Sequence, residues 1–190
     1  MWAFALTAGA AACDSGAPPL ASDAAAPGDG PTTATGADAE GSAGPLLTGS
    51  PDGAAFANAA AFVIETPDDE STTVIYVFSR PVRCIDLSFA GWDMHLPGGT
   101  TFLELKVSGH VPGTVWAVQA ERPAAGQVVV TYARPFVGGD SREVRASGGT
   151  VTLAAIAARG PASLNLSLAF GGHALTGGLA ALFCPGGHEP

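Results

Sequence analysis

The chain has 190 residues and a formal net charge of −9, with 26 glycines, 15 prolines and 13% charged residues. This glycine and proline content lies between that of a globular domain and that of a low-complexity chain. Lys106 is the single lysine, so the acidic chain lacks the basic signature of nucleic-acid-binding proteins and we expect no nucleic-acid partner. No apolar run reaches the roughly 18–20 residues that a membrane-spanning helix needs.

The first element in chain order is an apolar run over residues 2–12, which ends in three alanines before Cys13. An apolar core followed by small residues is typical of a signal peptide, here residues 1–12. The basic start of such a peptide is missing, so we expect the start codon to lie upstream of Met1. An ordinary secreted protein and a cytosolic chain are the alternative interpretations.

The three alanines and Cys13 resemble the end of a bacterial lipoprotein signal peptide, in which Leu and two small residues usually precede an invariant cysteine. The resemblance implies cleavage before Cys13 and attachment of lipid to its thiol. Two or three acyl chains anchor a protein stably, whereas one chain is marginal. We therefore expect a cell-envelope protein, anchored to the inner or outer membrane and facing the periplasm or the exterior.

Residues 13–55 are predicted to form a linker. From residue 14 onward this stretch contains six acidic and no basic side chains, and its large apolar residues are Leu20, Leu46 and Leu47. Such a segment cannot bury enough apolar surface to offset its conformational entropy, so we expect it to be disordered. It would act as a tether between the lipid and a folded domain over residues 56–190.

The domain is predicted to be all-β. Short runs rich in Val, Ile, Thr, Phe and Tyr alternate with Gly, Pro and Asp clusters, a pattern typical of an antiparallel sandwich or barrel. We predict a β-sandwich of about eight or nine strands. The predicted strands cover residues 59–65, 73–79, 84–89, 101–108, 114–120, 127–133, 149–156, 162–170 and 173–183.

The last two predicted strands have a specific register. Gly171 and Gly172 suit a two-residue turn, which would pair Leu168 with Leu175 and Leu164 with Leu179. The leucines then share one face, and a slip of one residue would destroy this arrangement. Residues 147–185 also resemble the closing segment of uncharacterised bacterial lipoproteins and secreted β-domains, which implies a β-sandwich without known chemistry.

The predicted domain contains two cysteines, Cys84 and Cys184. If Cys13 carries lipid and the protein is exported to an oxidising compartment, a Cys84–Cys184 disulfide is the favoured pairing. Two buried thiols are the alternative. A metal site is disfavoured, because neither cysteine has a second cysteine or histidine at the spacing of a zinc motif.

No sequence motif for catalysis is evident, and we expect no cofactor or metal. Trp92 lies in a Gly-flanked stretch and is the best candidate for ligand binding, whereas Trp116 is expected in the core. Asp93 and His95 could form an acid–imidazole pair, although a solvated loop is the simpler interpretation. Residues 68–70 are acidic and could recruit calcium, with a plain turn as the alternative.

Five arginines could form a basic face for an anionic ligand, with ordinary surface charge as the simpler alternative: Arg80, Arg83, Arg134, Arg142 and Arg145.

Taken together, the sequence favours a lipid-anchored, non-enzymatic binding, adhesion or structural module whose ligand is an unknown protein or carbohydrate. The alternatives are an envelope hydrolase or metal-dependent enzyme with a loop-built site, and a binder of small ligands or carbohydrate.

Overall fold

The computed structural model describes one unit of the chain, which lies within Ala34–Pro190. The described residues are 46–64, 72–108, 113–119, 127–134, 142–156 and 159–186. Cys13, the acidic run at 68–70 and most of the predicted linker lie outside them. The helices of the described part are two short 3-10 segments, and none could cross a membrane.

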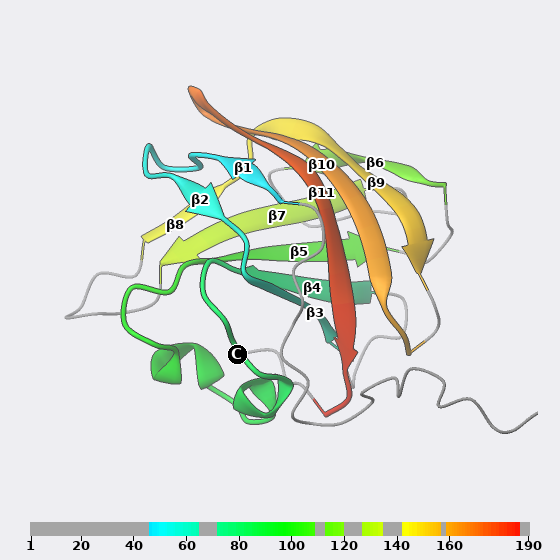
Figure 1. Cartoon of the computed structure of the whole chain (residues 1–190). Helices are drawn as coiled ribbons and strands as arrows, with labels where there is room; N and C mark the ends of the chain where they lie inside the picture. The colour runs from blue at the N-terminus through cyan, green and yellow to red at the C-terminus, as the bar shows by residue number, and fades with distance from the viewer. Residues whose placement is uncertain are drawn as a thin grey trace, which may run out of the picture. The chain divides into compact units, whose positions relative to one another are not determined.

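The described part is all-β, as predicted (Figure 1). Its strands are β1 (Thr48–Gly49), β2 (Phe56–Ala57), β3 (Ala60–Ile64), β4 (Thr72–Phe78), β5 (Phe102–Ser108), β6 (Val115–Gln119), β7 (Gln127–Arg134), β8 (Arg142–Arg145), β9 (Gly148–Ile156), β10 (Ala162–Phe170) and β11 (His173–Cys184). The 3-10 segments η1 (Cys84–Leu87) and η2 (Trp92–His95) both lie between β4 and β5.

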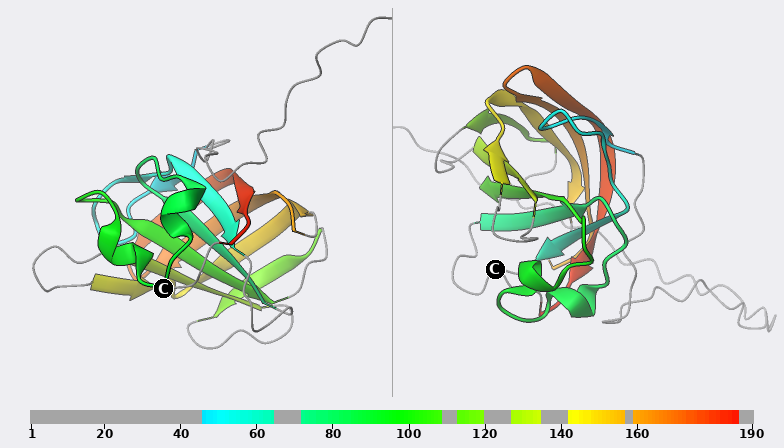
Figure 2. Two further views of the ribbon diagram at one scale, coloured as in Figure 1. Left: turned by 90° about the horizontal axis from the view of Figure 1, so that it is seen from below. Right: turned by 90° about the vertical axis from the view of Figure 1, so that its left-hand side faces the viewer.

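The prediction of a β-sandwich is wrong, because the sheet closes on itself into a barrel. Eight strands pair in the order β10, β9, β6, β7, β5, β4, β3 and β11, and β11 pairs again with β10. Two pairings, β6 with β7 and β3 with β11, are parallel, so the sheet is not purely antiparallel. Figure 1 shows β9, β10 and β11 lying across β3, β4, β5 and β7, and Figure 2 shows the strands curling around a common interior.

The β10–β11 hairpin confirms the predicted register. Leu168 pairs with Leu175 and Leu164 with Leu179, and Gly171–Gly172 form the two-residue turn. The leucines at these positions are buried, while the polar residues between them on β10 are exposed. Alternation of burial with a period of two therefore fixes the pairing, as expected for a strand with one core face.

The barrel interior is a packed core to which all eight barrel strands contribute. Leu47, just before β1, and Phe56, at the start of β2, are buried in this core. The Asn58 side chain supports this end, because its Oδ1 accepts a 2.6 Å hydrogen bond from the Leu47 amide. Residues 46–55, which the sequence placed in the linker, thus belong in part to the barrel.

Gly149 is one of the barrel glycines that leave no room for a side chain. Gly149 of β9 has φ +119°, and a Cβ there would overlap the backbone carbonyl oxygen of Ser167 on β10. At the neighbouring Gly148 a Cβ would meet no atom within 4 Å. The close approach of β9 and β10 therefore depends on glycine at position 149.

A second core lies outside the barrel. It joins one face of β3 and β4 to residues of η1 and η2, including Leu87 and Trp92. The predicted strand 84–89 is wrong, because its first four residues form η1. Polar side chains that bond to nearby backbone compete with strand pairing, and Asp86 and Ser88 do so here.

Candidate functional site

The long connection between β4 and β5 is the candidate site, and we call residues 79–101 the η1–η2 loop. Its ends are tied together: the Ser79 amide donates to the Thr101 carbonyl at 2.9 Å, and the Thr101 amide donates to Ser79 Oγ at 2.9 Å. A connection of this length between two strands is unusual and frequently carries function. Figures 1 and 2 place the loop outside the barrel, beside β3 and β4.

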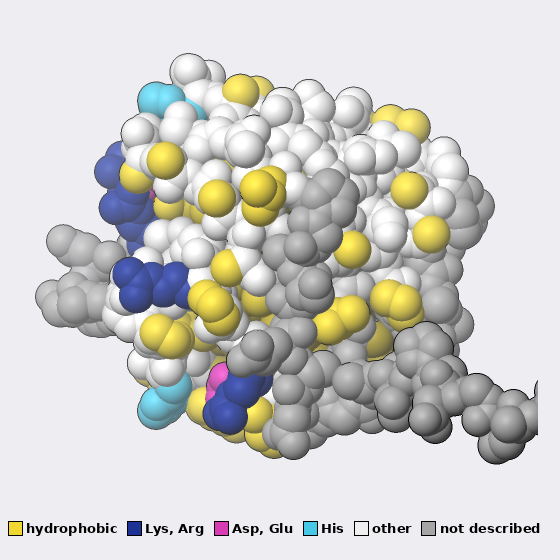
Figure 3. Space-filling view, in the orientation of Figure 1, with side chains coloured by type: hydrophobic (Ala, Val, Ile, Leu, Met, Phe, Trp, Pro, Cys, Tyr) yellow, Lys and Arg dark blue, Asp and Glu magenta, His cyan; other side chains and the backbone are white. Residues whose placement is uncertain are grey.

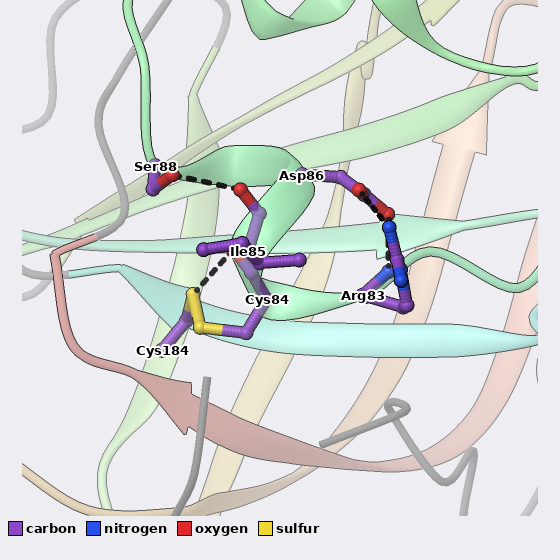
Figure 4. A network of polar contacts seen from close by, with 6 residues as sticks. All are labelled: Arg83, Cys84, Ile85, Asp86, Ser88 and Cys184. Atoms are coloured by element: carbon purple, nitrogen blue, oxygen red, sulfur yellow. Dashed lines mark hydrogen bonds and ion pairs between the residues drawn. A yellow bond between two sulfur atoms is a disulfide. The ribbon is translucent and has the colours of Figure 1, made fainter. Parts of the chain in front are cut away.

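A disulfide braces the first half of the loop (Figure 4). Cys84 of η1 is bonded to Cys184 at the end of β11, as the sequence favoured, and both residues are buried. The bond spans 100 residues of sequence and joins the loop directly to the barrel wall. The position of η1 is therefore fixed covalently as well as by packing.

Polar side chains in η1 and at its two ends form hydrogen bonds with the nearby backbone and with each other (Figure 4). Asp86 accepts hydrogen bonds from the Arg83 amide at 3.1 Å and from Arg83 Nη2 at 2.9 Å. These bonds hold the pKa of Asp86 below its ordinary value, with the Arg83 side chain as the largest cause. Ser88 Oγ donates to the Ile85 carbonyl at 2.7 Å. This turn of the loop is thus ordered by local polar contacts.

Trp92 anchors the second half of the loop. Its ring is fully buried, with centroids 4.9 Å from Tyr76, 5.5 Å from Phe102 and 5.6 Å from Phe78. Edge-on and tilted geometries of this kind are the favourable ones for aromatic pairs. The sequence singled out Trp92 for ligand binding, but in this structure no face of its ring is open to solvent.

The side chains that do reach solvent are apolar. Met94 is 70% exposed, and Ile85 and Phe89 are each 41% exposed. We call these three side chains the apolar surface of the loop. They are three of the five large hydrophobic residues that are exposed in the described part of the chain, the others being Leu46 and Val115. Exposed apolar side chains on an ordered loop make this surface a candidate interaction site.

Asp93 and His95 belong to the same loop, in η2. His95 is exposed, and its ring contacts Phe89 edge-on with centroids 5.2 Å apart, which places it beside the apolar surface. Within the described ranges no three His, Cys, Asp or Glu residues gather as a metal site would require. The arrangement here therefore offers apolar contact and hydrogen bonding, with no catalytic constellation among the described side chains.

The five arginines that the sequence grouped together lie in different surroundings. Arg83 pairs with Asp86 in the η1–η2 loop, and Arg80 lies over Gly99 in the same loop. Arg134 and Arg142 are paired residues of β7 and β8, and Arg145 belongs to the other face of β8. Figure 3 shows basic side chains gathered along one edge of the visible face. The five arginines therefore do not form one basic face, because two lie in the loop and three on β7 and β8 at the end of the barrel.

The candidate binding residues that the sequence indicated, Trp92, Asp93 and His95, lie in this loop, whereas its exposed apolar residues Ile85, Phe89 and Met94 were not predicted. The stretch FAGWDMH has two glycine or alanine positions and no periodic alternation, so nothing local separates its buried ring from its exposed side chains.

Comparison with protein-family models, curated proteins and solved structures found no match.

Proposed function

We propose that the protein is a lipid-anchored component of the bacterial cell envelope whose barrel binds a protein partner through the apolar surface of the η1–η2 loop. Lipid on Cys13 attaches the chain to a membrane, and the residues between Cys13 and Leu46 connect this anchor to the barrel. The observation that carries the proposal is the exposure of Met94, Ile85 and Phe89 on a loop braced by a disulfide and a buried tryptophan.

The energetics favour a binding role for this surface. Complete burial of one Phe, Ile or Met side chain contributes about 1.5–3 kcal/mol, so half-exposed residues retain roughly half of that for a partner. Because the loop is already ordered by Cys84 and Trp92, a partner does not have to order it. Such pre-organisation raises affinity by lowering the entropic cost of association.

A protein partner is favoured over a carbohydrate. Sugar rings stack on open aromatic faces, whereas Trp92, Trp116, Tyr76 and Tyr132 are each at most 2% exposed. Phe89, the exposed aromatic ring of the loop, is in contact with the His95 ring. The loop also carries Arg80, Arg83, Asp86 and Asp93, which balance in charge. Apolar side chains within a neutral polar rim are typical of protein interfaces.

Site-specific photo-crosslinking in cells tests the partner. A photo-reactive amino acid in place of Met94 is expected to capture one discrete partner, and the same partner should be captured from position 89. The matched control is position 115, because Val115 is 57% exposed but lies on β6. The Met94→Glu variant should abolish capture from position 89. Equal capture from positions 94 and 115 would contradict the proposal.

The anchor is tested separately. Mass analysis of the wild-type protein and of Cys13→Ser, with and without the signal-peptidase inhibitor globomycin, should show lipid on the wild type alone. The inhibitor should leave the wild type uncleaved. An unmodified wild-type protein in the soluble fraction would refute the anchor and leave the interaction surface to be judged by crosslinking.

A further inference from the structure

Two arginines face each other at one end of the barrel. β7 and β8 are antiparallel, with Tyr132 opposite Val144 and Arg134 opposite Arg142. Tyr132 belongs to the interior core and Val144 packs against it, so this face of the two strands points inward. Arg134 and Arg142 are the next pair on that face, beyond the core and at the barrel rim, because Arg134 is the last residue of β7 and Arg142 the first of β8.

At the rim, Arg134 and Arg142 place two positive charges directly opposite each other, which destabilises the pairing of β7 with β8. Directly opposed side chains have Cβ atoms about 4.5–5.5 Å apart, and like charges at such positions are unfavourable. One carboxylate offsets this: Arg134 Nη2 lies 2.5 Å from Oδ2 of Asp52, which is in the turn between β1 and β2. The Asp52 side chain is 1% exposed, whereas that of Arg134 is 42% exposed. Among the described residues Asp52 pairs with Arg134 and no carboxylate pairs with Arg142, so one positive charge is left over.

Arg134 is held in place by its neighbours. A hydrogen bond with the Tyr132 hydroxyl is the largest cause that raises the pKa of Arg134, and Asp52 adds to it. Its Nε is buried and has no hydrogen-bond partner among the described residues. The guanidinium is therefore charged and held in place, while 42% of the side chain remains exposed to an incoming anion. Arg142 is exposed and lies on the same face.

We propose that Arg134 and Arg142 form a binding site for a single oxyanion, a phosphate or a carboxylate group. A guanidinium presents paired N–H donors that match two oxygens of such a group, and two opposed arginines can share one anion. The anion neutralises the charge that Asp52 leaves over. Glu143 and Arg145 do not contribute, because they pair with Ala133 and Thr131 on the opposite face of the strands.

Titration of the full-length protein with inorganic phosphate at constant ionic strength tests the site, followed through the arginine side-chain NMR signals. The wild type should show saturable shifts at Arg134 and Arg142. Arg142→Gln should weaken binding by about tenfold or more, because it removes a charge-assisted pair of hydrogen bonds. Arg142→Lys keeps the charge but loses the paired N–H donors, so its phosphate affinity should lie between those of the wild type and Arg142→Gln.

Arg145→Gln is the matched control, because it removes the same charge from the same strand on the other face. It should change the phosphate affinity by less than about twofold, as expected for a screened charge. Equal losses for Arg142→Gln and Arg145→Gln would show general attraction only and overturn the site, as would a wild-type titration without saturation. A thermal melt of each variant verifies that it folds.

The oxyanion has two possible sources, and two further arms separate them. Inorganic phosphate and acetate report binding of a free anion. Phosphatidylcholine vesicles with and without phosphatidylglycerol report binding of a lipid phosphate, for which Cys13→Ser protein is used to remove the covalent anchor. Retention on the anionic vesicles that Arg142→Gln reduces and Arg145→Gln does not would assign the site to a headgroup. Saturable binding of phosphate without such retention would assign it to a free anion.

Discussion

Replacement of Trp92 by alanine removes the largest side chain of the core that lies between the η1–η2 loop and the barrel. The ring is fully buried and contacts Tyr76, Phe78 and Phe102 with centroids 4.9–5.6 Å apart. Truncation leaves a cavity against β4 and β5, because the disulfide at Cys84 prevents the loop from collapsing freely into the space.

The size of the loss follows from the buried area. A buried tryptophan removes about 150–250 Å² from water, which at about 25 cal/mol per Å² corresponds to roughly 4–6 kcal/mol as an upper bound. Large aromatic-to-alanine changes in cores cost about 3–5 kcal/mol. A loss of that size is a large part of the stability of 5–15 kcal/mol that is typical of a domain of about this length.

The assay is urea-induced unfolding of the oxidised protein, followed by far-ultraviolet circular dichroism. We expect Trp92→Ala to lower the free energy of unfolding by about 3–5 kcal/mol. Phe89→Ala is the matched control in the same loop, and its loss should stay below about 1 kcal/mol because Phe89 is 41% exposed. A loss for Trp92→Ala that is no larger than that for Phe89→Ala would refute the buried anchor.

Three further changes follow from the structure. Replacing Cys84 and Cys184 by serine should lower the free energy of unfolding by about 2–5 kcal/mol, because a loop closure of this length constrains the unfolded chain; equal stability of the reduced and oxidised wild type would contradict this. Gly149→Ala should cost at least about 2 kcal/mol in urea unfolding, whereas Gly148→Ala should cost less than about 0.5 kcal/mol. Equal losses of stability at the two glycines would contradict the close approach of β9 and β10 at Gly149. Asp86→Asn should lower the stability by no more than about 1 kcal/mol at neutral pH, because the ion pair is partly exposed. Since folding lowers the pKa of Asp86, the carboxylate stabilises the fold above the ordinary aspartate value of about 4, and the difference between variant and wild type should shrink as the pH falls below it. A difference that stays constant over this range would contradict the assigned role.

The sequence predicted those elements whose signal is local. In β10 and β11 the leucines alternate with polar residues across a two-glycine turn, so the register of the pair followed directly. Closure of the barrel had no such signal. It depends on the parallel pairing of Phe62 with Leu182, whose positions lie far apart in the sequence. Alternating strands satisfy a sandwich and a barrel equally well, so the pattern could not separate them.

The candidate site shows the same limit. Leu47 is a single large side chain in a stretch rich in Gly and Pro, so its burial in the core left no periodic trace. Trp92 and Met94 are two residues apart in a segment without regular periodicity, yet one is buried and the other is 70% exposed. Their different exposure is set by tertiary packing, because Trp92 contacts three aromatic rings of β4 and β5 and Met94 points to solvent.

The bond between Cys84 and Cys184 also divides the chain into a covalent ring and an arm. The ring contains every residue from η1 to the end of β11, whereas β1 to β4 lie on the arm. A protease that cuts once within the ring, for example between β7 and β8, leaves both products joined until the disulfide is reduced. A single cut between Phe78 and Cys84 instead leaves β1 to β4 held by hydrogen bonds and packing alone. The barrel strands of the arm, β3 and β4, and the six barrel strands of the ring therefore differ in their tolerance of a broken backbone.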